Sequence, residues 1–135
     1  MKNVVLLGST GSIGTSTCKV AEDLPDDIRL IGLAAGQNAT LLHEQVNQFS
    51  PAAISINCPD AAKEFTNEFN GKPEVHCGEE GLLKLATLPE ADIVLIAIVG
   101  TGGLQPALAA IRAGKDIAVA SKEILVMAGE IVMAE

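Results

Sequence analysis

Residues 4–14 read Val-Val-Leu-Leu-Gly-Ser-Thr-Gly-Ser-Ile-Gly, so a short apolar run leads directly into a loop that contains glycine at every third position. A continuous apolar run of this length is typical of a strand that is buried on both faces, as in a parallel sheet. The glycines lie where the strand must turn into a helix. In doubly wound α/β proteins this turn is where a dinucleotide's pyrophosphate is held.

Each of the three glycines has a separate predicted role. Gly8 permits the tight turn, Gly11 lets the backbone approach phosphate groups, and Gly14 lets the helix pack closely on the sheet. The free N–H groups at the helix start would then meet the anion. The spacing is G-x-x-G-x-x-G rather than G-x-G-x-x-G, so a plain glycine turn remains an alternative. A P-loop is disfavoured because no lysine follows Gly14.

The rest of the chain alternates short apolar runs with helical stretches, which predicts a doubly wound, Rossmann-like α/β fold with a mostly parallel sheet in a single domain. Strands are expected at residues 3–7, 28–35, 52–56, 74–76, 93–98 and 117–120. Helices are expected at residues 12–23, 41–49, 59–69, 79–88, 104–113 and 123–135.

The first two helices have recognisable apolar faces. The inward residues expected in the first are Ile13, Cys18, Val20, Ala21 and Leu24. Those expected in the second are Leu41, Leu42, Gln45, Val46 and Phe49, at a spacing close to 3.6 residues, with Thr40 as the capping residue.

Composition excludes several classes of function. The chain has 135 residues, 48% of them hydrophobic, so it can bury a sizeable core. The net charge of -8 and the absence of Trp and Tyr argue against nucleic acid as a partner, and the absence of Tyr excludes short-chain dehydrogenase chemistry. No apolar run is long enough for an export signal or a membrane span. We therefore expect a cytoplasmic protein with reduced cysteines.

The tip of the second strand indicates which cofactor is preferred. An acidic residue at this tip accepts the ribose hydroxyl of NAD, but no carboxylate occurs between Asp27 and Glu44. The amides of Gln37 and Asn38 could instead bind a 2′-phosphate, which favours NADP. A polar loop without a ligand remains the alternative interpretation.

Two later loops lie at the same edge of the predicted sheet. Residues 99–104 again bring glycines to the end of a buried strand, and Lys122 follows another strand, where it could hold an anionic substrate. Lys122 beside Glu123 could also be an exposed ion pair. His43 and His76 are expected to be solvated surface residues, and no metal triad or catalytic nucleophile is recognisable.

Several blocks together make the chain resemble the amino-terminal part of the 1-deoxy-D-xylulose 5-phosphate reductoisomerases, the NADPH enzymes of the non-mevalonate isoprenoid pathway. The resemblance covers essentially the whole chain. The blocks are residues 7–14, 35–38, 49–51, 97–100, 108–115 and 122–123.

The resemblance implies a site for NADPH and a contact to a sugar phosphate. It places the cofactor contacts on Thr10, Gly11, Ser12, Ile13, Gly36, Gln37, Asn38, Ser121 and Glu123, and the substrate contact on Lys122. Many members have a basic residue where this chain has Gln37, and an Asn where it has Ser121.

The resemblance also implies what residues 1–135 would be: the NADPH-binding domain of a homodimeric, metal-dependent oxidoreductase. The acidic ligands for Mg²⁺ or Mn²⁺, the substrate-covering loop and the catalytic and carboxyl-terminal domains would lie outside this chain, which we expect to be inactive alone. The alternative is a stand-alone nucleotide-binding or redox-sensing module.

Overall fold

The computed structural model describes residues 2–69, 73–98 and 103–119. Within these ranges the chain alternates regularly between strand and helix. The strands are β1 (Lys2–Leu7), β2 (Ile28–Ala35), β3 (Ala53–Ile56), β4 (Glu74–Cys77), β5 (Ile93–Ile96) and β6 (Asp116–Val119). The helices are α1 (Ser12–Asp23), α2 (Ala39–Phe49), α3 (Pro59–Phe69), α4 (Gly78–Ala86) and α5 (Leu104–Arg112).

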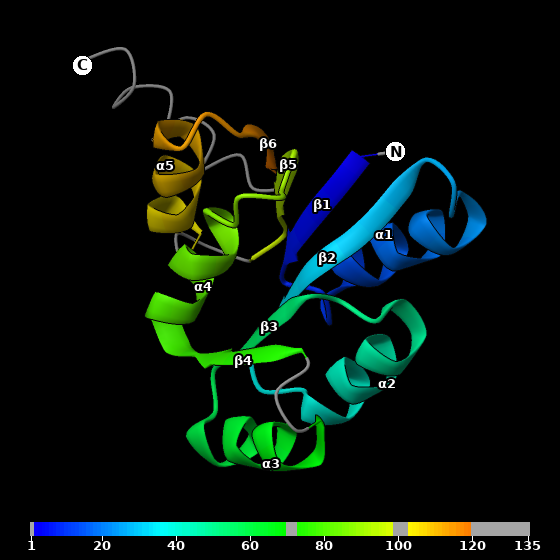
Figure 1. Ribbon diagram of the computed structural model, residues 1–135, viewed down its shortest axis with the longest axis vertical. Helices are drawn as coiled ribbons and strands as arrows, with labels where there is room; N and C mark the ends of the chain where they lie inside the picture. The colour runs from blue at the N-terminus through cyan, green and yellow to red at the C-terminus, as the bar shows by residue number, and fades with distance from the viewer. Residues whose placement is uncertain (1, 70–72, 99–102, 120–135) are drawn as a thin grey trace.

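The strands form one sheet in the order β4-β3-β2-β1-β5-β6, and every pair of neighbours is parallel. The chain therefore builds outward from β1 to β4, then returns through α4 to place β5 on the other side of β1 (Figure 1). This reversal creates a switch point between β1 and β5, where ligands of such sheets bind. The predicted doubly wound, parallel fold is confirmed.

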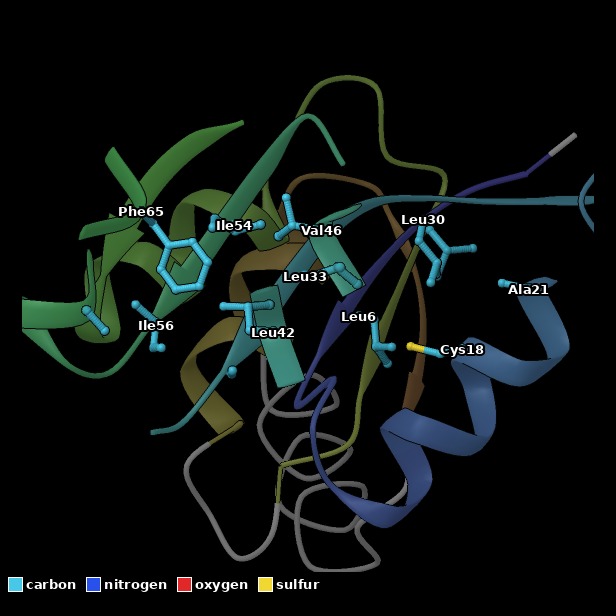
Figure 2. Close-up of a cluster of buried hydrophobic side chains, with 13 residues drawn as sticks. Leu6, Cys18, Ala21, Leu30, Leu33, Leu42, Val46, Ile54, Ile56 and Phe65 are labelled. Atoms are coloured by element: carbon cyan, nitrogen blue, oxygen red, sulfur yellow. The ribbon is translucent and has the colours of Figure 1, made fainter. Parts of the chain in front are cut away.

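Helices cover both faces of the sheet, so each central strand is buried from two sides. One apolar cluster joins the strands to α1, α2 and α3, and its members include Leu6, Leu33, Leu42 and Phe65 (Figure 2). A second cluster joins the opposite face to α4 and α5. Burial on both sides explains why these strands are continuous apolar runs.

The apolar face predicted for α1 is partly wrong. Cys18 and Ala21 are buried, but Ile13, Val20 and Leu24 are 50%, 46% and 44% exposed. The face that packs on the sheet runs through Gly14, Cys18 and Ala21, at spacings of four and three residues. Small residues occupy this face because the helix starts very close to β1.

The predicted start and cap of the second helix also need correction. Helix α2 begins at Ala39, and Asn38 caps it through Oδ1, which accepts a hydrogen bond of 3.2 Å from the N–H of Leu41. Thr40 lies in the first turn and is exposed. The predicted inward face is confirmed for Leu42, Gln45 and Val46, which are buried, while Leu41 and Phe49 at its ends are half-buried. The helix predicted at 123–135 lies outside the described residues.

Candidate functional site

A cavity of about 580 Å³ opens at the carboxyl edge of the sheet. This volume falls within the range of about 300–1,000 Å³ that is usual for small-molecule sites. Its walls come from the ends of β1, β2, β3 and β5 and from the start of α4. The lining residues are Gly8, Thr10, Gly11, Ala34, Ala35, Gly36, Ser55, Asn57, Gly78, Glu79, Leu82, Ala97 and Ile98.

Gly8 and Gly14 are required by the protein's own packing. Gly8 has a φ of +95°, and a Cβ there would lie 2.6 Å from the carbonyl oxygen of Ala97. A Cβ on Gly14 would overlap the carbonyl oxygen of Gly8 and lie 2.7 Å from the carbonyl carbon of Ser9. The predicted roles of Gly8 in the turn and Gly14 in helix packing are confirmed.

Gly11 differs because its own protein surroundings leave space for a side chain. A Cβ on Gly11 would meet only the carbonyl oxygen of Gly8, at an ordinary 3.7 Å, and its backbone is extended, with φ -79° and ψ 178°. Gly11 is the N-cap of α1, so no side chain caps this helix. The N–H groups of Ser12, Ile13 and Gly14 lack intrahelical acceptors by helix geometry. An anion in the cavity could accept them.

The tip of β2 forms the neighbouring wall. Gly36 has nothing within 4 Å of an added Cβ, and its carbonyl oxygen accepts a hydrogen bond of 2.8 Å from the N–H of Asn57, at the end of β3. Since Oδ1 of Asn38 accepts the capping bond from Leu41, the Nδ2 group of Asn38 is left as a donor at this tip. Gly36, Gln37 and Asn38 are all exposed.

The structure brings two of the predicted segments together. Thr10, Gly11 and Gly36 line the cavity, while Ser12, Ile13, Gln37 and Asn38 follow them on exposed backbone at the same edge. The loop at 99–102 and the predicted site residues Ser121, Lys122 and Glu123 lie outside the described residues.

Sequence reasoning missed the part of the wall contributed by β3 and α4. Ser55 and Asn57 belong to the carboxyl end of β3, while Gly78, Glu79 and Leu82 come from the start of α4. Their position after a parallel strand was a usable signal, because all such ends meet at one edge of the sheet. Glu79 is the one ionisable side chain among the lining residues that the structure describes.

The histidines and cysteines do not belong to this cavity. His43 lies between α2 and α3, with Nε2 2.8 Å from Oε1 of Glu68, and its side chain is 37% exposed. The side chain of His76 is only 15% exposed, so the expectation of a solvated surface residue is wrong for it. In the described ranges the cysteines are unpaired and no group of three His, Cys, Asp or Glu side chains could hold a metal.

Comparison with protein-family models identifies one family that matches almost the whole chain. Residues 4–129 match the family model described as 1-deoxy-D-xylulose 5-phosphate reductoisomerase. The chain belongs to this family. The resemblance inferred from the glycine loop and the later blocks is therefore confirmed.

Individual reductoisomerases are similar along nearly the whole chain. The enzyme of Geobacter metallireducens is 49% identical over 134 residues, and that of Pelotomaculum thermopropionicum is 44% identical over 135 residues. In both cases the match covers 98% of this chain and 35% of the relative. The chain thus spans about a third of the length of the reductoisomerases that it matches.

Solved reductoisomerase structures share the fold. The Zymomonas mobilis reductoisomerase in complex with NADPH superimposes with a TM-score of 0.87 at 34% identity, covering 98% of this chain and 35% of that one. A reductoisomerase in complex with magnesium gives a TM-score of 0.90 at 34% identity, covering 99% of this chain and 34% of that one.

Among the described helices, none has both the length and the hydropathy required to cross a membrane.

Proposed function

We propose that residues 1–135 form the NADPH-binding domain of a 1-deoxy-D-xylulose 5-phosphate reductoisomerase. The observation that carries this proposal is the coincidence of family membership with a glycine-lined cavity at the switch point of the sheet. Space at Gly11 and Gly36 fits a phosphate-bearing ligand, since both positions leave room that the protein itself does not use. When bound, NADPH would supply the hydride for the reduction.

Each part of the cavity has its own task in holding the cofactor. The uncapped start of α1 would bind the pyrophosphate through the N–H groups of Ser12 and Ile13, with Thr10 adding a hydroxyl. Gln37 and Asn38 would donate to the 2′-phosphate at the tip of β2. From the last loop, Ser121 and Glu123 are proposed as further cofactor contacts and Lys122 as a contact to the sugar phosphate.

The whole enzyme would convert 1-deoxy-D-xylulose 5-phosphate to 2-C-methyl-D-erythritol 4-phosphate. A divalent cation would polarise the substrate oxygens. The described residues do not offer a set of ligands for it, so we assign the cation to no residue of this part of the chain. We further propose a homodimeric enzyme located in the cytoplasm.

A stand-alone nucleotide-binding or redox-sensing module is not favoured. The relatives at 44% to 49% identity are named as reductoisomerases. Burial raises the pKa of the Cys18 thiol to about 11, so this cysteine stays protonated and unreactive at neutral pH. Cys18 therefore lacks the thiolate character that a redox sensor needs.

We expect the chain to bind NADPH more tightly than NADH, by about 1–3 kcal/mol, because the amides of Gln37 and Asn38 can donate to the additional phosphate. Neither amide carries a full charge, which keeps the preference moderate. Titration calorimetry with both cofactors measures it. Equal or reversed affinities would contradict the assignment of the β2 tip to the 2′-phosphate.

Replacing the one charged lining side chain should strengthen NADPH binding slightly. Glu79→Gln removes a negative charge from the cavity wall, and we expect affinity to rise about two- to threefold at low salt and less at high salt. The matched control is Glu80→Gln, which removes the same charge from the next residue, outside the lining. An identical gain in both variants would indicate only a change in net charge.

A further inference from the structure

The second helix carries a buried glutamine whose side chain reaches the glycine loop. Gln45 is 4% exposed, and its Nε2 group donates a hydrogen bond of 2.8 Å to the carbonyl oxygen of Ser9. Ser9 is fully buried, and 36 positions separate the two residues in the chain. This bond therefore joins α2 directly to the segment between β1 and α1.

Packing alone does not account for a glutamine at this position. Its neighbours on the same face of α2 are Leu42 and Val46, both buried in the apolar cluster that Figure 2 shows. The other side-chain atom of Gln45, Oε1, is buried without a hydrogen-bond partner. An unpaired buried polar atom is unfavourable, so filling the space alone would favour an apolar side chain here. An apolar side chain, however, could not donate a hydrogen bond to the carbonyl oxygen of Ser9.

The bond completes a set of restraints on Ser9. The N–H groups of Gly8 and Ser9 both donate to the carbonyl oxygen of Ala34, at 2.8 Å each, which fixes the loop to β2. Gln45 fixes the carbonyl on the other side of Ser9. The peptide that follows leads into Thr10 and Gly11, where the loop lines the cavity. Restraining this carbonyl therefore restrains the direction of the next N–H groups.

The same helix also carries the other end of the site. Helix α2 is capped by Asn38, at the tip of β2, and Gln45 lies two helical turns further on. One rigid element thus reaches both the proposed 2′-phosphate site and the proposed pyrophosphate loop.

From this geometry we infer that Gln45 is a positioning residue for cofactor binding, which holds the β1–α1 loop in the orientation that accepts a pyrophosphate. The inference rests on the proposed function. Without the bond, the Ser9 carbonyl must find another donor, and only a fraction of molecules keeps the competent loop. The apparent affinity then falls to that fraction of its original value.

Ligands that occupy only one part of the site provide the test. We expect Gln45→Leu to weaken binding of NADPH and of 5′-ADP, which carries the pyrophosphate, by about tenfold or more. Binding of 2′-AMP, which carries only the other phosphate, should stay within about twofold. Calorimetry or competition titration on the 135-residue chain measures all three, with circular dichroism as the check of folding.

Val46→Ala is the matched control, because it removes buried volume from the next residue of α2 without removing a donor. It should lower thermal stability and leave the three affinities unchanged. If Gln45→Leu leaves all three affinities unchanged, or weakens all three equally, the inference is wrong. If the wild-type chain binds none of the three ligands, the proposed function fails instead.

If the Gln45→Leu chain does not fold, a second variant and a measurement on the wild-type chain still test the inference. Gln45→Met keeps the length of the side chain and has no N–H or O–H group to donate to the Ser9 carbonyl, so the same split between ligands is expected. In NMR spectra of the wild-type chain, the side-chain amide of Gln45 should exchange slowly and shift with 5′-ADP but not with 2′-AMP. Exchange as fast as that of exposed glutamines would overturn the inference.

Discussion

A Gly11→Val chain should fold normally and show no detectable binding of NADPH. The backbone at Gly11, with φ -79° and ψ 178°, is one that valine adopts readily, and an added Cβ would meet only the carbonyl oxygen of Gly8 at 3.7 Å. We therefore expect a loss of about 1 kcal/mol in stability, from a poorer N-cap. The branched side chain would occupy the space that the pyrophosphate needs beside the uncapped helix. Circular dichroism and fluorescence titration separate the two effects.

Gly14→Val is the contrasting variant on the same loop. There a Cβ would lie 2.7 Å and 2.8 Å from backbone atoms of Ser9, which cannot move away without displacing the turn. We expect this variant to lose about 3 kcal/mol or more of stability. If Gly11→Val bound NADPH as the wild type does, the cofactor would lie elsewhere. If it lost as much stability as we expect for Gly14→Val, the space for a side chain at Gly11 would not exist.

The second large effect concerns catalysis. The 135-residue chain should not convert 1-deoxy-D-xylulose 5-phosphate, with Mg²⁺ or with Mn²⁺, even when NADPH is bound. The chain corresponds to 35% of the length of its relative from Geobacter metallireducens. In the proposed reaction a metal-assisted rearrangement precedes the reduction, and the described residues offer no set of ligands for the metal. A cofactor domain supplies the hydride donor but not this first step.

The assay follows the absorbance of the reduced nicotinamide with purified chain, substrate and each metal. The full-length Geobacter metallireducens enzyme, 49% identical over the shared part, serves as the positive control under the same conditions. Turnover by the 135-residue chain that persists through purification would mean that the catalytic apparatus lies within it. The assignment of these residues as a cofactor-binding domain would then be wrong.

Most of the fold could be predicted from the sequence because its strands are buried on both faces. Continuous apolar runs such as Val4–Leu7 and Ile93–Ile96 are hard to place anywhere except in a covered parallel sheet. The helix faces were harder to predict. In α1 the residues against the sheet are small, so the larger Ile13 and Val20 misled the assignment of the inward face.

The parts of the site that were predicted from the sequence are those whose residues lie together in one short segment. The glycine spacing and the tip of β2 are local signals, and their residues do meet at one edge. Glu79 lies about forty residues beyond the β2 tip in the chain. It lines the same cavity because α4 starts at this edge of the sheet. The bond between Gln45 and Ser9 joins two positions whose proximity depends on how α2 packs. No local pattern encodes the bond between Gln45 and Ser9, whereas the position of Glu79 directly after a parallel strand was a usable signal.

The central claim is that NADPH binds at the glycine loop and the tip of β2, and an NMR titration of the 135-residue chain with NADPH tests it most directly. The backbone amides of residues 10–13 and 36–38 should shift together and saturate with a single dissociation constant, while amides around His43 and Glu68 should stay unchanged. Saturable shifts confined to another part of the chain, or no saturable shifts at all, would contradict the account.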